Sequence, residues 1–254
     1  MGARLRRLGV TDVAVEGPRR TYAAVVATAA VALGLLAFAA DSVDGVVGQV
    51  VITLTSSGLA WGLAAFLAGR AAAGVRRAAG GATALLVLAT LLYYLLVLGV
   101  SRRWSGGFLE DGTSADLQGL RSVAIMTTVW LIGSLVAGPT LGLLGHVVRV
   151  GGVSPAALAA GVTCGLLSGE GWQAMVEVPP WQLLPVADPY QAEFIQGVVI
   201  SELLKIVLPL AVLVWLATAH RLWLAWPTLL VATASSGVLS ALLWYVLGAA
   251  ANSI

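Results

Sequence analysis

The sequence predicts an all-α protein, a polytopic bundle of about seven transmembrane helices. Of its 254 residues, 59% are hydrophobic and only 10% are charged, whereas a soluble domain carries about 25% charged residues. So few charges cannot cover a water-exposed surface, so we expect lipid to be the main solvent. The apolar residues also fall into stretches of roughly 20 residues, the length that crosses the hydrocarbon core.

The predicted spans cover, in chain order, residues 22–40, 47–68, 82–100, 122–144, 155–168, 194–216 and 222–250. The fifth is barely long enough, and a partial or re-entrant helix is allowed only where protein or a water-filled cavity surrounds it. The seventh is long enough to be tilted or to begin with an interfacial turn. Pro227 favours the turn, because proline fits the first turn of a helix.

The predicted domain organisation is a basic cytoplasmic segment, residues 1–21, followed by a single transmembrane helical domain, residues 22–254. The first span also resembles a signal sequence, because Ala37-Phe38-Ala39 has the small-residue pattern of a cleavage site and Arg19-Arg20 resembles a twin-arginine leader. A plain first helix is favoured, since the apolar stretch is longer than a usual signal-peptide core.

The distribution of arginines predicts the orientation, because short cytoplasmic loops are enriched in positive residues. With the N-terminus in the cytoplasm and the C-terminus outside, only Arg102, Arg103 and Arg121 lie outside. The inner segments then hold Arg4, Arg6, Arg7, Arg19, Arg20, Arg70, Arg76, Arg77, Arg149 and Arg221. The two longest loops, residues 101–121 and 169–193, are external. The second is rich in proline and aromatic residues and is expected to form an interfacial cap.

Several function classes are disfavoured by the sequence. The chain has one cysteine, Cys164, so an intrachain disulfide is impossible. The sequence lacks a basic patch with interleaved aromatic residues, the pattern that indicates nucleic-acid binding. It also lacks the hydrolase, metalloprotease, nucleotide-binding and redox motifs that would indicate an enzyme. His146 and His220 fall at the inner ends of spans as interfacial residues and lack a third ligand, so we expect no metal site and no cofactor.

Glu202 and Lys205 are the most informative polar residues, because they lie inside the sixth span. Lys205 is 11 residues from the start of that span, or about 16 Å at 1.5 Å per residue. A lone charge at that depth costs about 2.5–3.5 kcal/mol. The two residues share one helix face and can pair. They therefore predict either an internal substrate, ion or proton site, or a self-neutralising structural ion pair.

A ladder of small residues marks the fifth span, where Ala157, Gly161, Gly165 and Gly169 share one face and allow close helix packing. If the sixth span is the neighbour, Glu170 can approach Lys205 from the outer side. Lys205 would then lie between two carboxylates, in a site open to the outside. The alternative is that Glu170 is simply an interfacial acid.

Four further polar side chains are expected near Lys205 in that arrangement: Ser168, Gln173, Gln196 and Ser201.

In the fourth span, Gly138-Pro139 with Gly142 and Gly145 predicts a kinked packing face, or alternatively a hinge, because proline removes a backbone donor. The hydroxyl-bearing residues Thr55-Ser56-Ser57 have no general base in sight, and a serine without one is a weak nucleophile.

Ser57-Gly58-Leu59-Ala60-Trp61, followed by Ala65-Phe66 and Gly69, resembles the second-helix region of an actinobacterial multi-pass membrane family, domain of unknown function 6518. Other similar motifs are Tyr93-Tyr94, Trp130 followed by Gly138-Pro139 and Gly142, and Gly165-Leu166-Leu167-Ser168-Gly169-Glu170-Gly171. The resemblance covers most of the chain and implies an inner (plasma) membrane location. It implies no chemistry, because the family carries no established activity.

Two functions from different classes follow from the sequence. The first is a small-solute binding or transport protein whose substrate contacts Glu170, Glu202, Lys205, Ser168 and Ser201. The second is a membrane scaffold or partner-binding protein, in which Glu202 and Lys205 neutralise each other and the outer loops contact another membrane subunit. In both cases the lipid bilayer is the surrounding medium.

Overall fold

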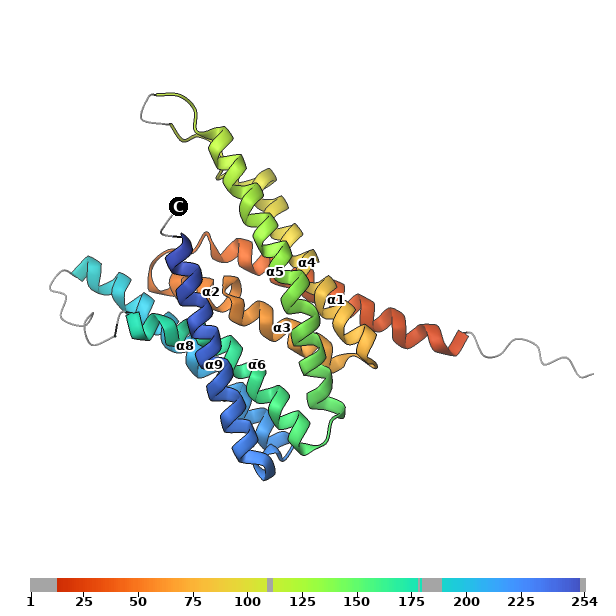
Figure 1. Ribbon diagram of the computed structural model, residues 1–254. Helices are drawn as coiled ribbons and strands as arrows, with labels where there is room; N and C mark the ends of the chain where they lie inside the picture. Colours follow the sequence, from red (N-terminus) through yellow and green to blue (C-terminus); the bar gives the residue numbers. More distant parts are fainter. Residues whose placement is uncertain (1–12, 109–111, 178, 180–188, 252–254) are drawn as a thin grey trace, which may run out of the picture.

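The computed structural model of the protein describes residues 13–108, 112–177, 179 and 189–251, and this part of the chain is all-α (Figure 1). By helix length and hydropathy it is a multi-pass membrane protein. Six helical stretches are long and apolar enough to cross a bilayer: Thr21–Ala40, Gly45–Ala71, Val75–Ser101, Asp116–Val150, Ile195–Ala219 and Leu222–Ala249. The predicted helical fold and membrane association are thereby confirmed, with six apolar spans among the described residues.

The helices extend beyond most of the predicted spans. In chain order they are α1 (Val13–Ala40), α2 (Gly45–Ser56), α3 (Gly58–Ala71), α4 (Val75–Leu96) with a π turn (Val97–Ser101), α5 (Asp116–Val150), α6 (Val153–Glu177), α8 (Pro189–Ala219), a 3-10 turn (Leu222–Ala225) and α9 (Trp226–Ala251). A 3-10 turn precedes α9, so the predicted turn is present, and Pro227 is the second residue of α9. Helix α1 already includes part of the segment expected to precede the first span.

Helix α6 corrects two predictions. It runs for 25 residues, from Val153 to Glu177, and is therefore longer than the predicted partial span 155–168. It also takes in Trp172 and its neighbours, which the sequence had assigned to an outer loop; residues 178 and 180–188 of that loop lie outside the described residues. Its small and polar residues make it less apolar than the six spans. It packs instead against α5, α8 and α9, so protein replaces lipid around most of its length.

The predicted second span is broken into two helices, which the hydropathy pattern did not show. Ser57 has extended backbone angles, with φ −76° and ψ 159°, and separates α2 from α3. Its hydroxyl donates to the Thr53 carbonyl oxygen, so it competes for backbone groups as serine often does. Gly58, a poor helix former, follows directly. The break leaves the C-terminus of α2 and the N-terminus of α3 inside the bundle.

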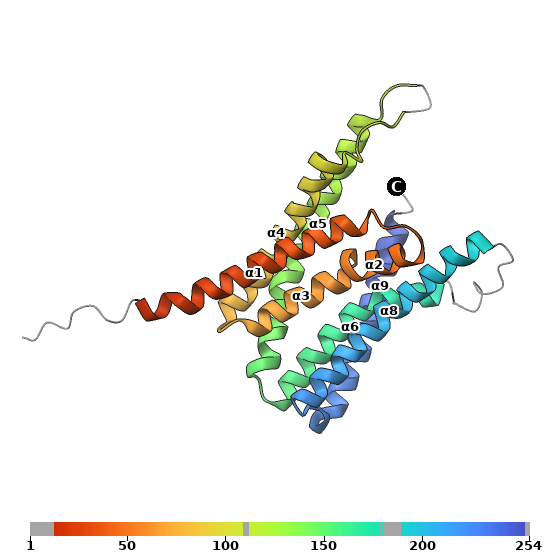
Figure 2. The ribbon, with the colours of Figure 1, turned by 180° about the vertical axis from the view of Figure 1, so that it is seen from behind.

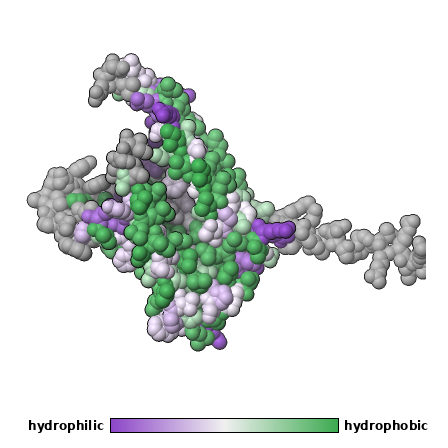
Figure 3. Space-filling view, viewed as in Figure 1, coloured by the Kyte–Doolittle hydropathy of each residue, from purple (hydrophilic) through white to green (hydrophobic). Residues whose placement is uncertain are grey.

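The bundle has two parts. Helices α1, α3, α4 and α5 pack on one another, and α6 packs between α8 and α9 (Figures 1 and 2). The parts meet where α5 and α3 contact α6 and where α2 packs against α8. The space-filling view shows a mostly hydrophobic surface over α5 and α9, with hydrophilic residues gathered toward the helix ends (Figure 3). This distribution suits a surface that faces hydrocarbon between two polar layers.

The small-residue ladder of α6 faces α9. It does not face α8, the helix of the sixth predicted span, which the sequence analysis considered as its neighbour. A Cβ atom added to Gly161 would lie 2.7 Å from the Leu229 carbonyl oxygen, and Gly165 and Gly169 contact α9 in the same way. In α5, Gly138 and Gly142 pack on α4, which is consistent with a packing face at Pro139. Close backbone contact therefore holds both parts of the bundle together.

His146, which the sequence predicts at the inner end of its span, is buried in α5 with 7% of its surface exposed. His220 lies at the end of α8, where its Nε2 atom is 2.9 Å from Nη2 of Arg70. Within the ranges that the structure describes, no group of three potential metal ligands gathers around either histidine.

We expect Gly161→Ala to lower the free energy of unfolding by roughly 1–3 kcal/mol, because the added methyl group overpacks the α6–α9 contact. The measurement is reversible unfolding in mixed detergent micelles. Gly80→Ala is the matched control, since nothing lies within 4 Å of a Cβ at that exposed position of α4. Equal stability of the two variants would contradict the assignment of Gly161 to a close helix contact.

Candidate intramembrane binding site

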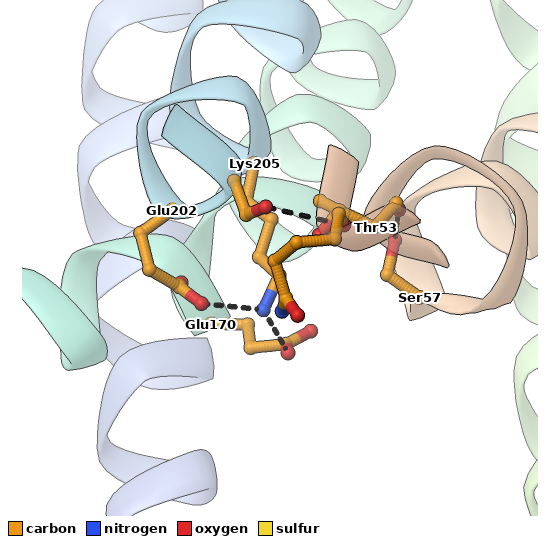
Figure 4. A network of polar contacts seen from close by, with 7 residues as sticks. Thr53, Ser57, Glu170, Glu202 and Lys205 are labelled. Carbon is orange, nitrogen blue, oxygen red and sulfur yellow. Dashed lines mark hydrogen bonds and ion pairs between the residues drawn. The ribbon is translucent and has the colours of Figure 1, made fainter. Parts of the chain in front are cut away.

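Lys205 lies between two carboxylates, one from α6 and one from its own helix, α8 (Figure 4). Its Nζ atom donates to Oε1 of Glu170 at 2.7 Å and to Oε1 of Glu202 at 2.8 Å. The Lys205 side chain is 13% exposed, compared with 19% for Glu202 and 27% for Glu170. The structure therefore contains the predicted arrangement of a lysine between carboxylates from two helices. We call these three side chains the triad.

Two features of the sequence bring the triad together. On α8, Glu202 and Lys205 are three residues apart and so share one helix face. On α6, Glu170 is followed by Gly171, and a Cβ atom there would lie 2.9 Å from the Glu202 carbonyl oxygen and 3.0 Å from the Lys205 Cβ. The missing side chain lets α6 approach α8, and this approach places Glu170 within reach of the lysine.

The triad carries one excess negative charge when all three groups are ionised, because two carboxylates face one ammonium group. The second oxygen of Glu202, Oε2, is buried and has no hydrogen-bond partner among the described residues. An unpaired charge within a bilayer costs about 2.5–3.5 kcal/mol on insertion scales, and a buried acceptor without a partner adds to that cost. The arrangement is therefore suited to accept a proton or a positively charged ligand.

The break between α2 and α3 forms a third side of the site. Figure 4 shows Thr53 and Ser57 of this segment next to the triad. Ser201, four residues before Lys205, donates from Oγ to the Gln49 carbonyl oxygen at 3.2 Å and ties α8 to α2. Discontinuous helices at membrane depth expose backbone groups, and in many transporters such groups build the substrate site.

A cavity of about 200 Å³ adjoins the triad on the side of Glu170. Its lining comes from α3, α4, α5, α6 and α9 and includes three indole rings, those of Trp61, Trp130 and Trp244. A second cavity of about 110 Å³ shares Trp61 and Trp130 as wall residues. Glu170 therefore joins the ion cluster to a space that can hold a small molecule, the combination expected of a ligand pocket.

The other predicted site residues are only partly brought together. Ser201 is buried and lies on the face of α8 that contacts α2. Ser168 is buried too, but it donates to the Gly165 carbonyl oxygen of its own helix and lines the groove between α6 and α9. Two residues along an α-helix turn the side chain by about 200°, so Ser168 and Glu170 face different neighbours. Gln173 lines the same groove as Ser168, and Gln196 is exposed.

Sequence reasoning missed the residues that α2, α3, α5 and α9 supply to the site. The residues in question are Gln49, Thr53, Trp61, Trp130 and Trp244. The motif Ser57-Gly58 was a usable indication, because a serine–glycine pair can interrupt a helix. The convergence of the three tryptophans had no indication in the sequence, since they come from helices far apart along the chain.

Comparison of the chain with protein-family models, with curated proteins and with solved structures gives no match. The resemblance to domain of unknown function 6518 therefore stays a prediction. What can be inferred about function rests on the triad, the helix break and the cavity.

We expect Lys205→Met to lower the free energy of unfolding by up to about 3–5 kcal/mol, because it leaves two carboxylates without their cation. The triple variant Lys205→Met/Glu170→Gln/Glu202→Gln carries no charge in the cluster and should recover most of that loss. Reversible unfolding in mixed micelles measures both. Wild-type stability of the single variant would show that the ion pairs contribute nothing to the fold.

Proposed function

We propose that the protein binds a small solute at the triad and its adjoining cavity and carries it across the membrane, without catalysing a reaction. The observation that carries this proposal is the excess negative charge of Glu170, Glu202 and Lys205 beside a cavity of about 200 Å³. Ionisable residues inside a membrane are costly, and they commonly mark substrate, ion or proton pathways.

The break between α2 and α3 supports transport in particular. A discontinuous helix can move at its break with less disruption of backbone hydrogen bonds than a continuous helix, because the extended backbone at Ser57 already interrupts the helical ladder. Its position beside Lys205 would couple such a movement to occupancy of the site. The sequence has no nucleotide-binding loop, so an ion gradient or a separate energy-coupling subunit would drive uphill transport.

We further infer that the protein lies in the plasma membrane with its N-terminus in the cytoplasm and its C-terminus outside. The ends of α3 and α8 meet through Arg70 and His220, and Arg149 of α5 donates to the Ala71 carbonyl oxygen at 3.2 Å. These contacts gather arginine-bearing helix ends at one face, the face that the positive-inside rule assigns to the cytoplasm.

Labelling with a membrane-impermeant maleimide tests this orientation. Phe108→Cys, at a position 78% exposed, should react in intact cells, whereas Ala73→Cys should react only after the membrane is permeabilised. The native Cys164 is buried and gives a low background. The reverse labelling pattern would show the opposite orientation.

The scaffold hypothesis has one observation in its favour. Both Lys205 hydrogen bonds go to carboxylates within the protein, so the triad can serve as a structural clamp between α6 and α8. The two hypotheses differ in what they require of Glu202. A clamp survives when Glu202 is neutralised, because the Lys205–Glu170 pair remains, whereas a charged binding site does not.

Native mass spectrometry of the protein released from nanodiscs distinguishes the two. We expect the wild-type protein to retain a small non-lipid molecule, and Glu202→Gln to lose at least about nine-tenths of it, since about 1.4 kcal/mol of lost affinity is a tenfold effect. Glu177→Gln is the matched control, because this exposed acid ends α6 away from the triad. A bound protein subunit with no small molecule, unchanged in Glu202→Gln, would support the scaffold hypothesis instead.

A further inference from the structure

We propose that the solute is a small alkylated ammonium ion, held in the 200 Å³ cavity between the Glu170 carboxylate and the indole rings of Trp61, Trp130 and Trp244. This inference rests on the proposed function and narrows it to one chemical class of solute. It is carried by the lining of the cavity, by the charge of the triad and by the size of the space.

The lining favours an organic cation over a polar neutral solute. Three tryptophans line one small cavity, and tryptophan is the aromatic side chain that attracts cations most strongly. The Trp61 indole N–H donates to the Thr55 carbonyl oxygen at 2.9 Å, which fixes this ring and occupies its only donor. Ser134, the hydroxyl in the lining, already donates to the Trp130 carbonyl oxygen at 2.8 Å. Two of the polar groups in the lining, the Trp61 N–H and the Ser134 hydroxyl, are therefore already engaged within the protein.

The charges around the cavity also favour a cation as the ligand, although the N-terminus of α3 opposes it. Gly58, at the N-terminus of α3, lines the cavity, and a helix N-terminus carries roughly half a positive charge. The triad carries a full excess negative charge when all three groups are ionised, and Glu170 is its member in the cavity wall. The larger of the two opposing charges is therefore the negative one, so the cavity attracts a positive ligand.

The size and the apolar surface of the cavity separate organic from inorganic cations. An apolar cavity of about 150 Å³ holds a molecule as large as benzene, so about 200 Å³ suits an ammonium ion with several methyl groups or short alkyl chains. Inorganic cations such as calcium and magnesium are held by a shell of oxygen ligands. This cavity offers mainly aliphatic and aromatic carbon around Glu170, which matches an alkyl-covered charge better than a bare one.

The second cavity extends the aromatic lining toward one end of the bundle. Trp61 and Trp130 line both cavities, and the second adds Tyr93 and Tyr94, whose rings meet edge to face with centroids 5.0 Å apart. The Tyr93 hydroxyl donates to Asp41 Oδ2 at 2.7 Å, close to the end of α1. A cation entering from that end would meet aromatic faces before it reaches Glu170.

Isothermal titration calorimetry of the full chain in nanodiscs tests the proposal with three probes: choline, its neutral carbon isostere 3,3-dimethylbutan-1-ol, and sodium chloride. We expect choline to bind at least about tenfold more tightly than the isostere, because only choline gains the cation–π and carboxylate contacts. Sodium should neither bind in this range nor displace choline. Equal affinity for choline and the isostere would overturn the assignment of a cation site.

Trp130→Leu and Trp172→Leu form a matched pair, because their exposed fractions are similar, 43% and 46%, and only Trp130 lines the cavity. We expect Trp130→Leu to weaken choline binding between about twofold and thirtyfold, the range of a cation–π contact, and Trp172→Leu to leave it unchanged. Equal effects of the two variants would contradict the indole site. Glu170→Gln should weaken choline binding more than either.

The failure of this inference can be told apart from the failure of the proposed function. If native mass spectrometry detects a retained small molecule that Glu202→Gln loses, but that molecule is anionic or neutral and choline does not bind, the solute site stands and the ammonium assignment is wrong. If no small molecule is retained and no probe binds, both proposals are wrong. If choline binds and responds to Trp130→Leu but not to Trp172→Leu, both are supported.

Discussion

The cost of charge inside a bilayer is the constraint on which the central part of this structure depends. Lys205 sits about halfway along an apolar helix, where an uncompensated charge costs several kcal/mol. The cost is met by two carboxylates, one from the same helix and one from α6. Because two carboxylates meet one ammonium group, the cluster keeps one excess negative charge when all three groups are ionised. The same interaction that holds α6 against α8 therefore leaves a negative site within the membrane.

Close packing of backbones makes this interaction possible. Lipid supplies no hydrophobic force between helices, so helix association depends on van der Waals contact and on hydrogen bonds across the interface. Helix α6 presents Gly161, Gly165 and Gly169 to α9 and Gly171 to α8. It therefore lies close to both partners at once. This central position places Glu170 where it contacts Lys205 and also lines the aromatic cavity.

The broken second span gives the site its third wall. A continuous helix would present only side chains to the triad, whereas the break at Ser57 brings two helix ends beside it. The partial charges of these ends are smaller than the full charge of the triad, so they modify the field and do not reverse it. Trp61 follows the break by four residues and bonds back across it to Thr55. The break and the aromatic wall are therefore parts of one local structure.

The sequence by itself determined the helical class, the membrane association and the pairing of Glu202 with Lys205, because hydropathy and the helical period are local properties of the chain. The tertiary structure decided what depends on neighbours. It showed that the glycine ladder of α6 faces α9, that Ser168 points away from Glu170, and that α6 is longer than its apolar core because protein surrounds it. The meeting of Trp61, Trp130 and Trp244 was equally out of reach of the sequence. Apolar membrane helices can pack in many registers, and only the folded bundle fixes which faces meet.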